Sequence, residues 1–468
     1  SNLTLNESFA DFSEMLWAEH KYGKDEGDAH SFQALQNYLF TPGANTLNLV
    51  RFYYDDKEDM FDAVSYQKGG RILNMLRTYL GDAAFFKGVN IYLKTNAFKA
   101  AEAQQLRLAL EEASGLDLNW FFNQWYYGAG HPKLNISYKW DESAKKETVF
   151  IQQTQDGQIF KLPIAIDVYA GGKKERHKVW INDKTDTLTL NAESKPDLVN
   201  VDGDKVLLCT KADNKTLDEF AFQYFNAPLY LDRLEAIDTA AVHQTDKDAQ
   251  KILIAALKDK YYGLRVQAIT ALKMNNEDIR NAALPVLTSL AQSDENTVAR
   301  AAAISVLGSL KIAGNMDIFK QALNSQSYAI QAAALMAINL LDPKQALGLA
   351  DGFEKDNKGD LTQAIIAVYA QNGSDDRWPF VLKTFNEFQL KFLLVQNLAT
   401  MTATMKSPEY AQQGIAMLKD WAILNKQFGA GKRGDRLLAD IKTKRAKLND
   451  DASVKAADDA IKQIDAAN

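Results

Sequence analysis

Four short segments in the C-terminal part of the chain are similar to one another: RLEAIDTA from Arg233, RVQAITAL from Arg265, RAAAISVL from Arg300 and QAAALMAI from Gln331. Their starting positions follow one another at a nearly constant interval. A repeat of this kind, with small residues inside a helical pattern, is typical of stacked helix pairs. Residues 213–468 are therefore predicted to form an α-solenoid, in which alanines let neighbouring helices approach closely.

The sequence before this array has a different period. Between residues 132 and 212, apolar and polar side chains alternate, as they do in half-buried strands. Gly171 and Gly172 fit a hairpin turn between two of these strands. We therefore predict a small β-sandwich here. The alternating apolar residues are Leu134, Ile136, Tyr138 and Trp140 in one strand, and Phe160, Leu162, Ile164, Ile166 and Val168 in another.

The N-terminal region, 1–131, has the apolar spacing of helices, and each candidate helix is followed by a glycine. Together with the two later regions this predicts a multidomain α+β protein: 1–131 helical, 132–212 β-sandwich and 213–468 helix pairs. The candidate helices are Glu7–Tyr22 before Gly23, Asp62–Leu80 before Gly81, and 102–113 before Gly115.

Composition excludes several classes of protein. A net charge of -6 argues against nucleic acid as a main partner, because phosphate binding needs a basic face. With Cys209 as its one cysteine, the chain has no intramolecular disulfide and no Cys-rich zinc site. No apolar run reaches about 18 residues, so no membrane span is expected. The cellular compartment stays open.

The first motif that carries chemistry is Asn6-Glu7-Ser8-Phe9-Ala10-Asp11, at the start of the first candidate helix. A carboxylate on a rigid helix suits a zinc ligand, and Asp11 lies on the same face, where it could hold a ligating imidazole. The alternative is that Glu7 is a solvated acid favoured by the helix dipole. Taken alone, the motif favours that alternative.

The second motif is Ser65-Tyr66-Gln67-Lys68-Gly69-Gly70, which opens the next candidate helix. A tyrosine there can donate a hydrogen bond to an oxyanion that develops on a substrate carbonyl. The alternative is a tyrosine packed on the core with its hydroxyl in water. A third feature, Trp125 followed by Gly130-His131-Pro132, has no evident chemistry and is expected to be a structural joint.

In order and spacing, the three motifs together resemble the zinc aminopeptidases of the membrane-alanyl and leukotriene-hydrolase type. That family carries Asn-Glu-Gly-Phe-Ala, then Tyr-x-Lys-Gly, then Trp followed by Gly-x-Pro. The domain order is similar too: the helical half of a thermolysin-like catalytic domain, a small β domain, and HEAT-like helix pairs. The resemblance covers residues 1 to about 140, and beyond that it is architectural. This chain has Ser8 where the family usually has glycine.

The resemblance implies metal-assisted removal of N-terminal amino acids from peptides. Glu7 would be the third zinc ligand, Tyr66 the oxyanion donor, and Asp11 and Glu14 acids that support the metal site. An acid at the position of Asp11 resembles the thermolysin-like branch of the superfamily. Glu14 occupies a position that is often acidic in the family. The family's other two ligands and its general base come from a His-Glu-x-x-His helix.

That helix has no counterpart in this chain. The five histidines include no pair with the His-Glu-x-x-His spacing, and the family's Gly-x-Met-x-Asn exopeptidase motif is absent. We therefore expect the partner of this chain to be the N-terminal half of the same protein. Alone, the chain is expected to hold no tight zinc and to be inactive. The histidines are His20, His30, His131, His177 and His243.

The sequence also allows other functions. A catalytically dead relative that binds partner proteins is the main alternative, and a stand-alone HEAT-type adaptor would leave the helical region before the β-sandwich unexplained. Epoxide hydrolysis, known in one branch of the family, stays open. The helix pairs could cover the active-site cleft or bind a partner protein. Gly429-Ala430-Gly431-Lys432 lacks the spacing of a phosphate loop. The basic run 442–447 has acidic residues nearby, so it is expected to be a solvated helix face.

Overall fold

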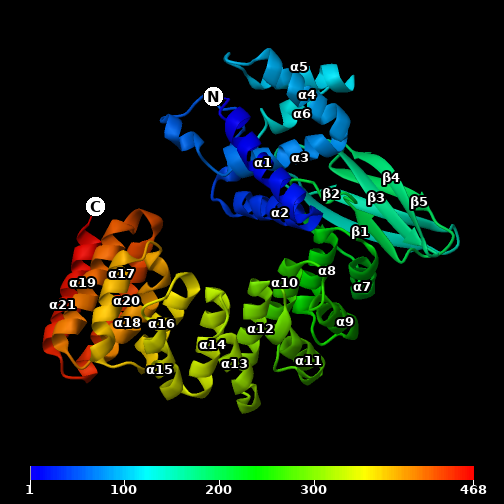
Figure 1. Ribbon diagram of the computed structural model, residues 1–468. Helices are drawn as coiled ribbons and strands as arrows, with labels where there is room; N and C mark the ends of the chain where they lie inside the picture. Colours follow the sequence, from blue (N-terminus) through cyan, green and yellow to red (C-terminus); the bar gives the residue numbers. More distant parts are fainter. Residues whose placement is uncertain (1, 468) are drawn as a thin grey trace. The chain divides into compact units, whose positions relative to one another are not determined.

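The computed structural model describes residues 2–467 and forms two compact units, residues 1–264 and 265–468 (Figure 1). The division falls inside helix α10 (Tyr262–Ala271). Both expected domain boundaries, after residues 131 and 212, lie within the first unit. The predicted multidomain α+β fold, with a helical start, a β-sandwich and paired helices, is confirmed.

The first unit begins with the helices that the sequence predicted and with others that it did not. The predicted helix at Glu7–Tyr22 begins earlier, at Thr4, and a second helix follows it directly after Gly23. The elements are α1 (Thr4–Tyr22), α2 (Lys24–Phe40), the short 3₁₀ turns η1 (Ala44–Thr46) and η2 (Lys57–Met60), the π-helix η3 (Val64–Lys68), α3 (Gly69–Leu80), α4 (Asp82–Thr95), α5 (Ala103–Ser114) and α6 (Asn119–Trp125).

The β-sandwich has a four-stranded sheet in the order β5-β2-β1-β7 and a three-stranded sheet in the order β4-β3-β6. Gly171 and Gly172 form the predicted hairpin turn, and Leu162 pairs with Ile181 at its open end. The strands are β1 (Lys133–Asp141), β2 (Lys146–Gln153), β3 (Leu162–Ala170), β4 (Lys173–Ile181), β5 (Thr185–Asn191), β6 (Leu198–Val201) and β7 (Thr210–Asp213).

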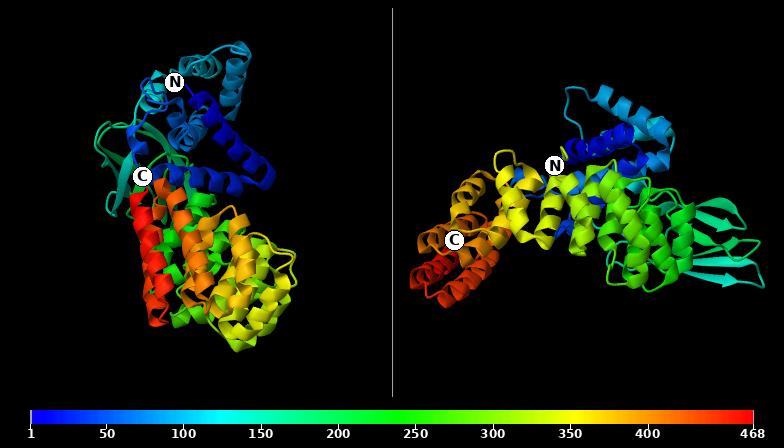
Figure 2. Two further views of the ribbon diagram at one scale, coloured as in Figure 1. Left: turned by 90° about the vertical axis from the view of Figure 1, so that its left-hand side faces the viewer. Right: turned by 60° about the horizontal axis from the view of Figure 1, so that its bottom comes forward.

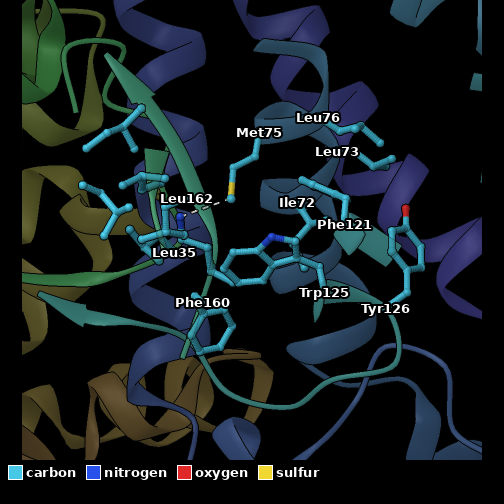
Figure 3. Close-up of a cluster of buried hydrophobic side chains, with 14 of the residues drawn as sticks. Leu35, Ile72, Leu73, Met75, Leu76, Phe121, Trp125, Tyr126, Phe160 and Leu162 are labelled. Atoms are coloured by element: carbon cyan, nitrogen blue, oxygen red, sulfur yellow. Dashed lines mark hydrogen bonds between the residues drawn. The ribbon is translucent and has the colours of Figure 1, made fainter. Parts of the chain in front are cut away.

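One hydrophobic core joins the helices to the sandwich (Figure 3). Trp125 is 1% exposed and its ring lies 4.9 Å from that of Phe160, just before β3. Met75 of α3 accepts a hydrogen bond from the backbone N–H of Leu208, at 3.3 Å. Because this core is shared, α3 and its neighbours are held against the sandwich rather than forming a separate layer.

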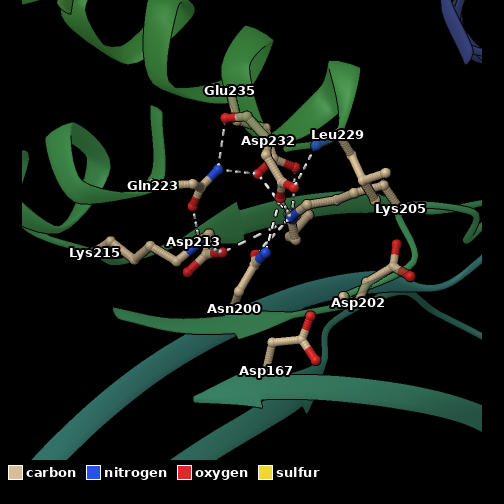
Figure 4. Close-up of polar contacts among 12 residues, drawn as sticks. Asp167, Asn200, Asp202, Lys205, Asp213, Lys215, Gln223, Leu229, Asp232 and Glu235 are labelled. Carbon is tan, nitrogen blue, oxygen red and sulfur yellow. Dashed lines mark hydrogen bonds and ion pairs between the residues drawn. The ribbon is translucent and has the colours of Figure 1, made fainter. Parts of the chain in front are cut away.

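Three helices and the start of a fourth complete the first unit. They are α7 (Leu217–Asn226), α8 (Tyr230–Val242), α9 (Lys247–Ala256) and the first residues of α10. A buried polar network links them to the sandwich (Figure 4). The Lys205 ammonium donates to Asn200 at 2.8 Å and to Glu235 of α8 at 2.9 Å. Since each of these groups has a partner, burial of the charges is compensated.

The second unit consists of helices that pack side by side, as Figure 2 shows for the yellow-to-red part of the chain. The repeated segments occupy α8, α10, α12 and α14, every second helix, as expected for helix pairs. The elements are α11 (Glu277–Ser293), α12 (Thr297–Ser309), η4 (Ala313–Asn315), α13 (Met316–Ala322), α14 (Tyr328–Leu341), α15 (Pro343–Phe353), α16 (Gly359–Asn372), η5 (Asp375–Arg377), α17 (Trp378–Glu387), η6 (Lys391–Leu393), α18 (Val395–Thr404), α19 (Pro408–Leu424), η7 (Lys426–Phe428), α20 (Ala430–Lys447) and α21 (Asp451–Ala466).

Helices α12 and α14 show why small residues recur in the repeat. A Cβ atom placed on Gly308 would lie 2.6 Å from Cβ of Ala337, which is too close for two carbon atoms. The two helices therefore approach as closely as the predicted alanine pattern requires. Among residues 2–467, none of the helices combines the length and apolar character needed to cross a membrane.

Candidate active site

The two residues singled out from the sequence, Glu7 and Tyr66, lie together in the structure. Glu7 is on α1 and Tyr66 is in the π-helix η3, and both side chains are half-buried. The Glu7 carboxylate raises the pKa of the Tyr66 phenol above its ordinary value of 10. At neutral pH the tyrosine is therefore a protonated group that can donate a hydrogen bond, and a carboxylate lies nearby.

The backbone around Tyr66 differs from the single helix predicted for Asp62–Leu80. The backbone N–H of Lys68 bonds to the carbonyl of Ala63 at 2.9 Å, and that of Gly69 bonds to the carbonyls of Val64 and Tyr66. Bonds from residue i to residue i−5 define a π-turn, which holds one more residue than an α-turn. The regular helix α3 begins only at Gly69.

An ion pair fixes the start of the π-turn. The carboxylate of Asp62 accepts hydrogen bonds from the backbone N–H groups of Val64 at 3.1 Å and Ser65 at 2.9 Å. The guanidinium of Arg51 donates to the same oxygen at 2.7 Å and to the Ser65 hydroxyl at 3.3 Å. Asp62 therefore caps the two N–H groups that lead into Tyr66.

Two glycines let α1 pack directly on α3. A Cβ atom on Gly69 would lie 1.7 Å from Oγ of Ser8, and one on Gly70 would lie 2.1 Å from Oδ2 of Asp11. Neither position can therefore take a side chain without moving α1. This contact places the residues that flank Glu7 against those that follow Tyr66.

The structure places Asp11 and Glu14 on α1, in the two turns after Glu7. Asp11 is 9% exposed, and burial raises its pKa to about 6, although nearby His30 counteracts this and Glu14 adds to it. The Glu14 carboxylate lies 3.8 Å from Nε2 of His30, and its side chain is largely exposed. The carboxylate of Asp11 therefore faces α3, whereas that of Glu14 faces α2.

A buried lysine lies just behind the π-turn. Lys68 is fully buried, donates to the carbonyl of Leu47 at 3.3 Å and lies 5.8 Å from the ring centre of Tyr38. Burial lowers the pKa of Lys68 to about 7, with a contribution from Arg51. The Tyr38 hydroxyl is 3.2 Å from Nδ1 of His131, whose pKa burial lowers to about 4. His131 is thus neutral at neutral pH.

A zinc ion at this site would need enough side chains that can act as its ligands. Structural and catalytic zinc sites use at least three protein ligands. Within residues 2–467, His, Cys, Asp and Glu side chains form no group of three or more that could hold a metal ion. Glu7 is a suitable oxygen ligand, but the described residues alone do not complete a zinc site.

A separate cavity of about 790 Å³ lies in the first unit, between α2, the sandwich and α8. Arg71, Asp202, Lys211 and Cys209 are among the residues that line it. Burial, aided by nearby Asp202, raises the pKa of the Cys209 thiol to about 12. The cavity does not include Glu7 or Tyr66.

Sequence reasoning missed Ser8, Arg51 and Asp62 as parts of this site. Ser8 was noted only as a departure from a glycine. The signal that could have pointed to Asp62 is an acid just before a helix start, which is a common capping pattern. Nothing in the sequence indicated that Arg51 is its partner.

Two parts of the chain match known families. Residues 1–125 match the model of the peptidase family M1 domain, and residues 219–308 match the model of HEAT repeats. The N-terminal part of the chain is thus similar to M1 peptidases and residues 219–308 are similar to HEAT repeats, in agreement with the resemblance that the motifs predicted.

Several aminopeptidases are similar to part of this chain. Probable aminopeptidase 2 of Sulfurisphaera tokodaii is 27% identical over 206 residues, which are 43% of this chain and 26% of that protein. Aminopeptidase N of Lactococcus lactis is 29% identical over 175 residues, 35% of this chain and 20% of that protein. The matched part thus spans about a quarter or less of these relatives.

Among solved structures, the crystal structure of Legionella pneumophila aminopeptidase A in complex with aspartic acid has a similar fold. The TM-score is 0.63, and the match covers 99% of this chain and 62% of that one. At 13% sequence identity, this likeness concerns the fold alone.

Proposed function

We propose that this chain supplies Glu7 and Tyr66 to the active site of a zinc aminopeptidase, which removes N-terminal amino acids from peptides. The observation that carries the proposal is the contact between α1 and η3, in which Ser8, beside Glu7, donates a hydrogen bond of 2.7 Å to the backbone carbonyl of Ser65, beside Tyr66. The M1 match over residues 1–125 supports it, because both residues lie in the matched part.

Tyr66 is the group that would act on the substrate. Peptide hydrolysis develops negative charge on the carbonyl oxygen, and a fixed donor stabilises that charge more than it stabilises the neutral carbonyl. The phenol keeps its proton at neutral pH, since its ordinary pKa is 10.0 and the neighbouring Glu7 carboxylate raises that pKa further. The half-buried side chain leaves the hydroxyl within reach of a bound peptide.

Glu7 would be one of three protein ligands of a zinc ion. Zinc in such a site polarises the scissile carbonyl and lowers the pKa of bound water to about 7. The two histidines and the general base would come from polypeptide outside this chain. This division is proposed because the five histidines of the sequence include no pair with the His-Glu-x-x-His spacing.

Asp11 and Glu14 would support the metal site from behind Glu7. A ligating imidazole needs a partner for its second ring nitrogen, and a carboxylate is the usual one. Asp11 lies one helical turn beyond Glu7, so it is the better placed of the two acids. Glu14 would be an outer neighbour, since its side chain is largely exposed and near His30.

The test is the Tyr66→Phe variant of the whole protein, assayed with aminoacyl-p-nitroanilides. Loss of one oxyanion donor is expected to lower kcat by about 10²–10³-fold. Zinc content, measured by atomic emission, should be unchanged because the phenol is not a ligand.

Tyr22→Phe is the matched control. Tyr22 lies at the end of α1 and is 64% exposed, so its hydroxyl should not affect kcat. A Tyr66→Phe enzyme with the same kcat as the wild type would remove Tyr66 from the proposed reaction. If the whole wild-type protein, and not only this chain, is inactive and holds no zinc, a scaffold that binds partner proteins would be favoured instead.

A further inference from the structure

We propose that Ser8 is a positioning residue, whose hydroxyl holds the π-turn of Tyr66 against the helix that carries Glu7. The hydroxyl of Ser8 donates a hydrogen bond of 2.7 Å to the backbone carbonyl of Ser65. Ser8 directly follows Glu7, and Ser65 directly precedes Tyr66. The bond therefore links the two backbone positions adjacent to the proposed ligand and the proposed donor.

The π-turn explains why this carbonyl needs a partner. In a regular α-helix, the backbone N–H of Gly69 would bond to the carbonyl of Ser65. In η3 that N–H bonds to Val64 and Tyr66 instead. Ser65 is fully buried, so its carbonyl requires another donor, and the Ser8 hydroxyl supplies one.

The direction of the hydrogen bonds follows from the number of protons. A serine hydroxyl has one hydrogen to donate, and that of Ser8 goes to the Ser65 carbonyl. The Thr4 hydroxyl lies 2.5 Å from that of Ser8, so Thr4 must be the donor of the second bond. The order is Thr4 to Ser8 to Ser65, and the Ser8 and Thr4 side chains are 1% exposed.

Gly69 is part of the same contact between α1 and the π-turn. A side chain at position 69 would occupy the space of the Ser8 hydroxyl, since its Cβ would lie 1.7 Å from Oγ. Asp62 holds the π-turn from the other end, through the N–H groups of Val64 and Ser65. The turn that carries Tyr66 is thus anchored at its start by Asp62 and along its side by Ser8.

The experiment uses the whole chain, Ser1 to Asn468, with 3-fluorotyrosine at position 66, followed by ¹⁹F NMR. Ser8→Ala and Ser8→Gly both remove the hydroxyl, so the second variant keeps the experiment decisive if the first disturbs folding. We expect the Tyr66 resonance to shift and broaden, because the turn that carries its ring loses the hydrogen bond to α1. These readouts need neither zinc nor activity.

Two other hydroxyl deletions serve as controls. Ser13→Ala removes an exposed hydroxyl from the same helix, and Thr4→Val removes a buried hydroxyl but leaves the Ser8–Ser65 bond in place. Both should keep the position and width of the wild-type Tyr66 resonance. If Thr4→Val changes them as much as Ser8→Ala does, the effect is general loosening of α1 and the proposal is overturned.

A purely structural role is also distinguishable. A Ser8→Ala protein with a lower melting temperature, but with the Tyr66 resonance of the wild type in position and width, would overturn the proposal. The inference rests on the proposed role of Tyr66, but its test does not. Unchanged kcat in Tyr66→Phe would refute the catalytic role, while the ¹⁹F measurement would still decide whether Ser8 positions the phenol.

Discussion

Lys68 is an unusual residue for the interior of a protein. It is fully buried, and the carbonyl of Leu47 and the ring of Tyr38 are its close neighbours. Neither of these is a carboxylate, and the nearby carboxylate of Asp62 only partly offsets the removal of the ammonium group from water. This burial explains why the pKa of Lys68 falls to about 7.

The lowered pKa predicts a pH-dependent stability. Between about pH 7 and the ordinary lysine pKa of 10.5, the unfolded chain binds more protons than the folded one, so the free energy of unfolding rises with pH. The cost of burying the charge is greatest below pH 7. We expect Lys68→Met to raise the free energy of unfolding by about 1–3 kcal/mol at pH 6, with a smaller gain at pH 9.

Urea unfolding at pH 6, 7.5 and 9 measures this difference. Lys94→Met replaces an exposed lysine on α4 and should give a difference from the wild type that does not change with pH. A Lys68→Met protein that is less stable than the wild type at all three pH values would contradict the argument.

At the scale of residues, the sequence identified Glu7 and Tyr66 because their chemistry and spacing belong to a pattern. It gave no reason to join Ser8 to Ser65 or Arg51 to Asp62. Those contacts depend on a local backbone geometry and on how two helices meet, and neither property is encoded in a single residue. The roles assigned to Glu7, Tyr66, Asp11 and Glu14 stay predictions.

At the scale of elements, the helix at Asp62–Leu80 was predicted, but its first turn was not. Apolar periodicity locates a helix over several turns, whereas a π-turn adds one residue at a single place. Its stability here comes from the capping by Asp62 and the hydrogen bond from Ser8. The helix Lys24–Phe40 was missed because it begins directly after Gly23, which was interpreted only as a helix end.

The close approach of α12 and α14 predicts the effect of one methyl group. Gly308→Ala would place a Cβ atom 2.6 Å from that of Ala337, so the two helices must separate. We expect a loss of about 1–3 kcal/mol in the free energy of unfolding, measured by urea denaturation.

Gly348→Ala is the matched control for that substitution. Gly348 lies inside α15, and a Cβ atom there would meet no atom within 4 Å. Alanine favours a helix over glycine, so this variant should gain about 0.5–1 kcal/mol. Equal effects of the two substitutions would show that the contact between α12 and α14 is looser than the structure indicates.

At the scale of the whole molecule, the metal content of the chain can be predicted. Glu7 offers one carboxylate, and the residues from 2 to 467 contain no cluster of metal-ligating side chains that would complete a site. The purified chain should therefore hold far less than one zinc ion per molecule by atomic emission, and it should not hydrolyse aminoacyl-p-nitroanilides. One zinc per chain that is lost in Glu7→Gln would contradict this.

The architecture was the most predictable property of the molecule. The change from a period of two to the period of a helix separates the sandwich from the helices, and the recurring Ala-rich segments mark the helix pairs. These signals extend over many residues, so single exceptions do not hide them. The core shared by the helices and the sandwich was not predictable, because Trp125 and Phe160 meet only in the folded chain.

Cys209 has a practical consequence for labelling experiments. It is the one cysteine in the sequence, and its raised pKa keeps the thiol protonated at neutral pH. Maleimides and similar probes react with the thiolate, so the native thiol should react slowly. A cysteine introduced on the surface can thus carry a fluorophore or spin label selectively, without first replacing Cys209.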